Sequence, residues 1–524
     1  MTAGDTNQTP GQDDLGRARL PEWLDPLPDA AGQRSLDDWA IRQLGIPGTD
    51  LMERAGAGLA ELVADRVPAG RVVVVCGKGN NGGDGFVAAR LLRDRGRDVH
   101  VLSLAAVDEL HGDALINAER LPGPAPEPFR ADALIGADGV VDAILGTGFT
   151  GVPRDPAASA IEAINAAAAA ATVIACDVPS GVDASTGETA GVAVRARATA
   201  TFHVAKPGLW IAPGKAYAGE VTVVDIGIPS GGPADPSIGL IGDRVTDGIP
   251  RRGRESTKFA AGSVLVCGGS IGLTGAPCLA SEAAMRAGAG YVTAFVPGSL
   301  NAIFESRLLE VMTIPLPDDG RSLEPAGAEQ VLERSARADS LVLGPGLGRR
   351  EGAIALARSL AGATRIPLLL DADGLNAHAG VLSSLAGRPA ATVITPHAGE
   401  LGRLFETDSS GIDARRLESA RHAAAIARAI VVLKGDDTIV AEPDGRVGVS
   451  RGGAPALATA GTGDVLSGVI GAYLAKRMDP FHAACAGVFV HACAGRLAAH
   501  ALGPEGVIAS DVIEALPRAL PTRS

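Results

Sequence analysis

The stretch VVVVCGKGNNGGDGF, residues 72–86, sets the fold class of the first half of the chain. Four valines and a cysteine form an unbroken apolar run, which is typical of a strand buried on both faces of a parallel sheet. Five glycines follow, and those at 77, 79 and 82 satisfy G-x-G-x-x-G, the pattern of a phosphate-binding turn that opens a helix. The order of strand, glycine turn and helix predicts a βαβ unit.

The glycine pattern alone does not identify a ligand. A working dinucleotide site usually adds an acidic residue about twenty positions further on, where it binds a ribose hydroxyl. Here that place reads SLAA (103–106), and Asp108 lies beyond it, so the match is poor. The glycine loop instead carries Asn80, Asn81 and Asp84, whose side-chain oxygens a plain phosphate turn does not need.

Both halves of the chain alternate apolar runs with helical stretches. In the first half, RVVVVCG (71–77) and DVHVLSL (98–104) are expected strands, and FVAARLLRDRG (86–96) is an expected helix. The pattern restarts at SVLVCGGSIGLTGAP (263–277). Such alternation predicts α/β domains with mostly parallel sheets and helices on both faces.

Composition suggests three segments along the chain. A stretch rich in Gly, Pro and Ser (228–239) precedes a basic stretch (251–258), so the domain boundary is predicted near 247. The expected segments are a disordered leader over 1–30, a first domain over 31–246 and a second domain over 247–524.

The net charge limits the kinds of molecule that the chain can bind, and its cysteines indicate the cellular compartment. The net charge of −13 argues against a nucleic-acid partner, because such binding needs clustered Lys and Arg. The six cysteines form no C-x-x-C pair and are expected to be buried in a reducing compartment. The chain shows no apolar run of roughly 18 residues and no basic, apolar leader. These features predict a cytoplasmic protein that does not enter a membrane.

Two further strand-end loops in the first half supply oxygen atoms. One carries Asp142, and the other carries Asp177, Ser180 and Asp183. Carboxylate, amide and hydroxyl oxygens with few neighbouring cations would make a site for a hard metal ion if these strand ends converge. The alternative interpretation is that Asn, Asp and Ser simply fill turns.

ALATAGTGDVLSG (456–468) is the most specific motif of the second half. It predicts a glycine-rich turn that opens a helix, whose first N–H groups can hold an anion such as a transferring phosphate. The motif resembles that of ribokinase-like proteins, and Asp464 lies where they place a base that contacts the acceptor hydroxyl; the alternative is that it only caps the helix. The motif is no Walker A loop, because no GK[ST] follows.

Four motifs of the first half, LMERAG (51–56), GNNGGDG (79–85), DAILGTG (142–148) and DVPSGVD (177–183), resemble the epimerase domain of the bifunctional NAD(P)H-hydrate repair family. The second half resembles the family's ADP-dependent dehydratase domain. The resemblance implies a Rossmann-like doubly wound domain followed by a ribokinase-like domain. It also implies two substrates, NADHX and NADPHX, which are NADH and NADPH hydrated at C6 of the nicotinamide. ADP is the implied nucleotide. Homo-oligomers are common in the family.

The resemblance also implies the residues of the epimerase site. Those expected to contact substrate are Asn80, Asn81, Gly82, Gly83, Asp84, Gly146, Thr147, Gly148, Phe149, Thr150, Gly151, Val152 and Asp177. The ligands implied for K+ are Asn81, Asp142 and Ser180. Because Asp177 ends an apolar strand beside the cation loop, we expect it to give and take the proton during epimerisation. Lys206 is a weaker candidate, for which a solvated lysine is the favoured interpretation.

For the dehydratase site, the resemblance implies substrate contacts from Ala276, Gly346, His397 and Asp464. His397 has an alternative interpretation as a capping residue. The resemblance also implies that the nucleotide is bound together with Mg2+. The residues expected to contact the nucleotide are Lys434, Gly435, Asp436, Asp437, Thr438 and Gly463. The chain departs from the family pattern at two positions, Ala398 and Ala454, where Pro and Asn are usual.

Two other functions remain open on the sequence. The chain could be a kinase of a small alcohol with an accessory dinucleotide-binding domain, since one fold hosts many functions. Alternatively, the first half could be a binding or scaffold module. The cluster of Asn81, Asp142 and Ser180 would then bind no cation.

Overall fold

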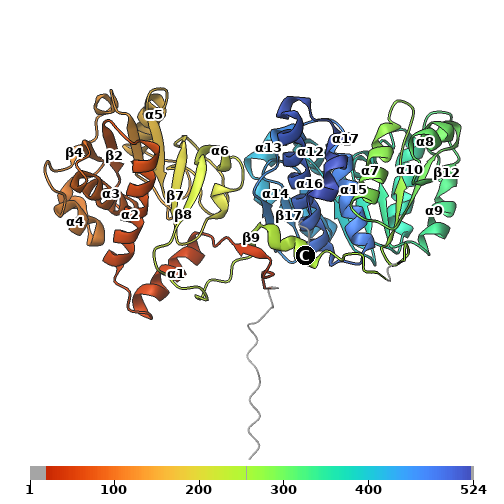
Figure 1. The fold of residues 1–524 in the computed structure, drawn as a ribbon, viewed down its shortest axis with the longest axis horizontal. Coiled ribbons are helices and arrows are strands. Elements are labelled where there is room, and N and C mark those ends of the chain that lie inside the picture. Colours follow the sequence, from red (N-terminus) through yellow and green to blue (C-terminus); the bar gives the residue numbers. More distant parts are fainter. Residues whose placement is uncertain (1–18, 255–256, 521–524) are drawn as a thin grey trace, which may run out of the picture.

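The computed structural model describes residues 19–254 and 257–520. Two α/β lobes lie side by side, the first coloured red to yellow and the second green to blue (Figure 1). Each lobe is built on its own sheet. The α/β fold class and the division into two domains are therefore as predicted.

The first lobe contains a seven-stranded sheet in which every pair of neighbours is parallel. In spatial order its strands are β4 (Glu127–Pro128), β3 (Val99–Ser103), β2 (Val72–Cys76), β5 (Gly139–Ala143), β6 (Thr172–Cys176), β7 (Ala198–Phe202) and β8 (Glu220–Val224). The strand order reverses between β2 and β5. A doubly wound sheet binds its ligand at the carboxyl ends of the strands beside such a switch point.

Helices cover both faces of this sheet: α1 (Ala30–Arg42), α2 (Gly48–Arg66), α3 (Asn80–Asp94), α4 (Gly112–Glu119), α5 (Ala157–Ala167) and α6 (Lys215–Ala218). Side chains of β2 alternate between two cores, with Val72 and Val74 packed on the α2–α3 side and Val73 and Val75 on the α5 side. The whole of β2 is therefore buried, which explains its unbroken apolar sequence. Helix α3 begins at Asn80, earlier than the predicted residue 86, so Asn80 to Asp84 form helical turns rather than a loop.

The second lobe contains an eleven-stranded sheet. Its order is β1 (Leu24–Pro26), β9 (Ile238–Ile241), β18 (Val447–Ser450), β17 (Ile439–Ala441), β16 (Ile430–Leu433), β15 (Thr392–Ile394), β14 (Leu368–Leu370), β13 (Ser340–Leu343), β10 (Ser263–Cys267), β11 (Tyr291–Pro297) and β12 (Met312–Leu316). The block from β16 to β12 is parallel, and β17 is antiparallel to both of its neighbours.

The helices of the second lobe also lie on both faces of the sheet. They are α7 (Gly275–Arg286), α8 (Asn301–Arg307), α9 (Ala328–Ser335), α10 (Glu351–Ala363), α11 (Asp373–Asn376), α12 (Ala398–Phe405), α13 (Ser409–Ala414), α14 (Arg416–Ala427), α15 (Thr462–Ala475), α16 (Pro480–Leu502) and α17 (Ala509–Ala515). Among the described residues, only α16 has the length and apolar composition of a membrane span. Of its most apolar window, 56% is buried, as is usual for a core helix.

Two predicted boundaries are wrong where the structure describes them. Residues 24–26, assigned to a disordered leader, form β1 and pair with β9 of the second lobe. Residues 1–18 of that expected leader lie outside the described part of the chain. By sheet membership the domain boundary falls between β8 and β9, earlier than 247, because β9 pairs with β18. The short apolar strand β9 begins at the end of the Gly-, Pro- and Ser-rich stretch 228–239, so that stretch itself marks the boundary.

Candidate active sites

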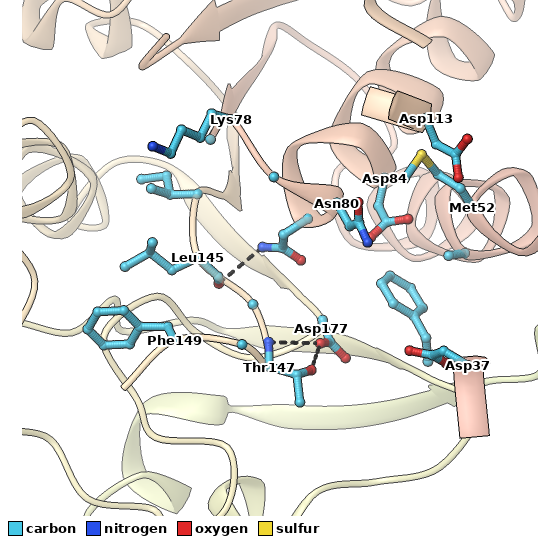
Figure 2. A pocket seen from close by; sticks show the side chains of 18 of the residues that line it. Asp37, Met52, Lys78, Asn80, Asp84, Asp113, Leu145, Thr147, Phe149 and Asp177 are labelled. Carbon is cyan, nitrogen blue, oxygen red and sulfur yellow. Dashed lines mark hydrogen bonds between the residues drawn. The ribbon is translucent and has the colours of Figure 1, made fainter. Parts of the chain in front are cut away.

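A cavity of about 940 Å³ opens at the carboxyl ends of the strands in the first lobe (Figure 2). It lies where β2, β5 and β6 end, and α1 and α2 complete its wall. Asp37, Lys78, Asp84, Phe149 and Asp177 are among its lining residues. The polar loops singled out in the sequence therefore converge at the switch point of the sheet, as the doubly wound fold requires.

Most of the residues predicted to contact the substrate line this cavity, but not all do. Those that line it are Asn80, Asn81, Asp84, Gly146, Thr147, Gly148, Phe149 and Asp177. Those that do not are Gly82, Gly83, Thr150, Gly151 and Val152. A Cβ on Gly82 would lie 1.9 Å from the carbonyl oxygen of Gly77. This glycine therefore lets α3 approach the end of β2 closely, which is a structural task.

Asn81, Asp142 and Ser180 form a single hydrogen-bonded group with the backbone of Leu145. Ser180 donates from Oγ to Asp142 Oδ1 at 2.6 Å, and Asn81 Nδ2 donates to the carbonyl oxygen of Leu145 at 3.1 Å. The amide oxygen of Asn81 is buried and has no hydrogen-bond partner among the described residues. Burial raises the pKa of Asp142 to about 6, although hydrogen bonds from Ser180 and Ile144 oppose the rise.

These observations fit the expected K+ site. The group offers an unpartnered amide oxygen, a buried carboxylate and a hydroxyl, which are the hard oxygen ligands that such cations take. A cation bound here would also offset the cost of burying the charge of Asp142.

Asp177 follows β6 directly and is held in an unusual backbone conformation. Its φ is 63°, in the left-handed region that non-glycine residues rarely adopt, and such strain concentrates at functional sites. Lys206 Nζ lies 2.7 Å from Asp177 Oδ1, and the hydroxyl of Thr147 donates to Asp177 Oδ2. Burial alone would raise the pKa of Asp177, but Lys206 and Thr147 outweigh it and lower that pKa below its ordinary value.

Lys206 is buried, with 1% of its side chain exposed, so the prediction of a solvated lysine is wrong. It also donates to Thr201 Oγ1 at 3.0 Å and to the carbonyl oxygen of Phe202 at 2.9 Å. The ammonium group therefore has three acceptors, one of them the carboxylate of Asp177. The apolar sequence around it, HVAKPG, gave no sign of this ion pair.

Two further carboxyl groups face the same cavity. Burial and the charges of Asp177 and Asp37 raise the pKa of Asp84 well above its ordinary value. Burial also raises the pKa of Asp37, which lies on α1 and was not singled out from the sequence. The site therefore combines two carboxyl groups whose pKa values are shifted in opposite directions, that of Asp177 downward and that of Asp84 upward. Two carboxyl groups with opposed pKa shifts are the usual arrangement for acid–base chemistry.

In the second lobe, Asp464 lies in the first turn of α15. The cap of this helix is Gly461, whose φ of 89° is left-handed, so the interpretation of Asp464 as the cap is wrong. Within the described part of the chain, the carboxylate of Asp464 forms no hydrogen bond. Burial, followed by the negative charge of Asp371, raises the pKa of Asp464 to about 7. The carboxylate is thus available to accept a proton near neutral pH.

Lys434 follows β16 and links the end of β14 to helix α12, beside Asp464. Its ammonium group lies 3.0 Å from Asp371 Oδ1 and 3.4 Å from Glu400 Oε2. Burial would lower the pKa of Lys434, but these two carboxylates raise it overall. Ser467 Oγ donates to Asp371 Oδ2 at 2.7 Å. Asp371 and Glu400 were not predicted, although the run PLLLDADG ends in acidic residues at a strand end and offered a signal.

The other predicted residues of the dehydratase site lie around this network. A Cβ on Gly463 would lie 3.6 Å from Lys434 Nζ, so α15 and the segment 434–438 converge. Gly346, at φ 61°, lies beside Ala276, since a Cβ added to it would be 3.3 Å from the Ala276 Cβ. Within 434–438, Thr438 Oγ1 donates to the carbonyl oxygen of Gly435 at 2.6 Å and closes a tight turn.

His397 and Asp437 use their side chains for structure. His397 caps α12, because its Nδ1 accepts from the N–H of Gly399 at 3.0 Å, which confirms the capping alternative. Its ring is nevertheless about half exposed, at 53%. Asp437 is buried and accepts from Arg416 Nε at 2.8 Å. Ala398 occupies the first position of α12, so this helix begins without the proline that is usual there.

A doubly wound domain followed by a ribokinase-like domain, each with carboxylates at its strand ends, defines a two-site α/β enzyme. The family model described as YjeF-related protein N-terminus matches residues 48–208, and the model described as NAD(P)H-hydrate dehydratase matches residues 264–518. The chain belongs to the bifunctional NAD(P)H-hydrate repair enzyme family. The resemblance noted in the sequence is thereby confirmed.

Two relatives illustrate the extent of the match. The bifunctional NAD(P)H-hydrate repair enzyme Nnr of Moorella thermoacetica is 40% identical over 94% of this chain and 96% of that protein. The enzyme of the same name from Salinibacter ruber is 37% identical over 94% of this chain and 96% of that protein. Among solved structures, the ADP/ATP-dependent NAD(P)H-hydrate dehydratase of Bacillus subtilis, co-crystallised with ATP/Mg2+, is 28% identical, covers 53% of this chain and 95% of that one, and has a TM-score of 0.46.

Proposed function

We propose that this chain repairs hydrated NADH and NADPH in two steps. The first domain interconverts the R and S hydrates, and the second domain removes water from the S hydrate with ADP. The observation that carries the proposal is the match to bifunctional repair enzymes along 94% of the chain, across both sites. The free cysteines, five of them buried, fit a reducing compartment, and we place the enzyme in the cytoplasm.

The chemistry of the first site follows from its two kinds of carboxyl group. Epimerisation at C6 requires that the centre carrying the hydroxyl and the ring nitrogen open and reform through proton transfer. We assign Asp177 as the base, because Lys206 and Thr147 keep it ionised. We assign Asp84 as the acid, because burial and the charges of Asp177 and Asp37 raise its pKa. K+ held by Asn81, Asp142 and Ser180 would supply a fixed positive charge that orders the loop ends around the substrate.

The chemistry of the second site depends on the leaving group. Hydroxide leaves poorly, whereas phosphate leaves well. Transfer of the terminal phosphoryl group of ADP to the C6 hydroxyl, which leaves AMP, therefore lets the oxygen depart as inorganic phosphate. A proton leaves C5 in the same elimination, and the dihydropyridine is restored. Asp464 accepts the hydroxyl proton, and the N–H groups that begin α15 stabilise the transferring phosphate.

Mg2+ would enter this site on the nucleotide phosphates. Such ions are usually bound through one or two carboxylates together with phosphate oxygens. Residues 19–254 and 257–520 contain no cluster of three His, Cys, Asp or Glu side chains that could hold a metal alone, which is compatible with binding through the nucleotide.

The test of this function uses an equal mixture of R and S hydrates of NADH with the full-length protein, ADP, Mg2+ and K+. We expect NADH to be recovered from the whole mixture, together with inorganic phosphate. Recovery that stops at half would contradict an epimerase in the first domain. A stable phosphate ester that accumulates without NADH would instead indicate a small-alcohol kinase.

Removal of K+ should lower the affinity of the epimerase site for its substrate. With K+ replaced by a large organic cation at equal ionic strength, we expect substrate affinity of the first site to fall on the order of tenfold. The Asn81→Ala variant should lose this response, because the unpartnered amide oxygen would be gone. The measurement is epimerisation rate against K+ concentration, and dehydration of pure S hydrate by the same variant is the control. A flat K+ response in the unaltered protein would contradict the site.

A further inference from the structure

One segment of the first domain, from Lys206 to Lys215, extends from one proposed site to the other. At its start, Lys206 forms the ion pair with Asp177. At its end, Lys215 begins α6, which lies on the side of the first lobe that faces the second lobe (Figure 1). The proposed nucleotide segment 434–438 therefore lies against the epimerase-like domain.

Within the described part of the chain, the ammonium group of Lys215 binds only atoms of the second domain. It lies 2.6 Å from Asp436 Oδ2, and it donates to the carbonyl oxygens of Asp436 at 3.1 Å and Arg451 at 3.2 Å. A lysine ammonium group has three protons to donate, so this one is fully used. The Lys215 side chain is 19% exposed, whereas that of Asp436 is 68% exposed. The lysine is therefore the anchored partner, and it holds the backbone of the proposed nucleotide segment.

A second contact of the same segment reaches the next residue. The backbone N–H of Ala212 donates to Asp437 Oδ2 at 2.9 Å. Arg416, from α14, donates to the same oxygen at 2.8 Å and also reaches the carbonyl oxygen of Lys434 at 3.2 Å. Next to Ala212 in the chain, Ile211 is fully buried in the core of the second domain. The turn 434–438 is thus held by its own domain on one side and by the first domain on the other.

We propose that Lys215, supplied by the first domain, is a positioning residue of the nucleotide site in the second domain. Ordering a mobile loop on binding costs free energy, and a loop already held in its bound form binds its ligand more tightly. Lys215 does so by binding both the carboxylate and the backbone carbonyl oxygen of Asp436. This inference rests on the proposed function, since it requires that 434–438 bind the nucleotide.

The test compares Lys215→Met with the unaltered full-length protein. Methionine keeps most of the apolar stem and removes the three hydrogen bonds. We expect the KM and the Kd for ADP to rise on the order of tenfold, while kcat at saturating ADP changes little. The KM of the epimerase reaction should stay unchanged. Calorimetry with ADP measures the Kd directly, and Lys215→Arg, which retains the charge and can donate to the same acceptors, should restore part of the affinity.

Arg66→Ala is the matched control. Arg66 pairs with Glu220 of β8 at 2.8 Å, so the change removes an ion pair of similar length from the strand that follows α6, wholly within the first domain. It should leave the affinity for ADP unchanged.

Three results separate the possible failures. An unchanged Kd for ADP in Lys215→Met, with the unaltered protein active, would overturn the inference and leave the proposed function standing. The inference would also be overturned if Lys215→Met and Arg66→Ala lost the same amount of epimerase activity, dehydratase activity and thermal stability. The contact of Lys215 would then be only structural. An unaltered protein that neither binds ADP nor forms NADH from the S hydrate would overturn the proposed function itself.

Discussion

Asp464→Ala should abolish nucleotide-dependent dehydration of the S hydrate, with a fall in kcat on the order of 10²–10⁴-fold. The carboxylate lies at the positive end of α15, is only partly exposed and is not committed to any hydrogen bond among the described residues. No other carboxylate at this site is free in the same way, because Asp371 and Glu400 are both bound to Lys434. Loss of Asp464 therefore removes the acceptor for the hydroxyl proton.

The measurement is steady-state formation of NADH from pure S hydrate, with ADP affinity determined separately. Asp511→Ala is a suitable control, because Asp511 is likewise the third residue of a helix, α17. Its Oδ2 accepts from the N–H of Ile508 at 2.8 Å, so the variant should lose about 1 kcal/mol of stability and no dehydratase activity. Epimerase activity should survive in both variants. Loss of both activities in Asp464→Ala would contradict two independent sites.

The same residue should set the pH profile of dehydration. The carboxyl group is protonated below its pKa and cannot accept a proton, whereas above it the ionised form can. With a pKa of about 7 in the free protein, kcat/KM should rise as the pH increases through about 7 and then level off. Asp464→Asn should give a low rate without this rise. A rate that falls over the same range would contradict the role of Asp464 as a base.

Asp177→Asn should remove epimerase activity by a similar factor, on the order of 10²–10⁴-fold. Asparagine keeps the shape of the side chain but cannot take up a proton at neutral pH. It also leaves the charge of Lys206 buried without its counterion, since the lysine is only 1% exposed. Breaking a buried ion pair in this way costs about 3–5 kcal/mol of stability. A loss of activity in this variant could therefore have two causes.

The double variant Asp177→Asn with Lys206→Met separates them. It removes both charges, so it should fold more stably than Asp177→Asn alone and still fail to epimerise the substrate. The measurement is the conversion of pure R hydrate to S hydrate, alongside thermal unfolding. Dehydration of pure S hydrate by the same protein is the internal control, because the second site is intact. Epimerase activity that returns in the double variant would exclude Asp177 as the base.

The local sequence was sufficient to predict those parts of the structure that depend on residues close together in the chain. The valine run of β2, the glycines after it and the helix at 462–475 each carry a short-range pattern, and so their strand, turn and helix could be predicted. The polar loops could be placed near one another because parallel strands end at one edge of a sheet. The resemblance to the family added the proposed cation ligands and the proposed nucleotide segment, which composition alone does not specify.

Other features arise from contacts between residues far apart in the chain, and these were missed. Strand β1 looked like part of an unstructured leader because its stability comes from pairing with β9, more than two hundred residues away. Lys206 looked solvated because its partner, Asp177, is brought to it only by the packing of β6 against β7. The contact of Lys215 with Asp436 spans two domains and follows from how they are docked. Burial and ion pairing of this kind depend on which distant residues share a volume, which no local pattern of side chains encodes.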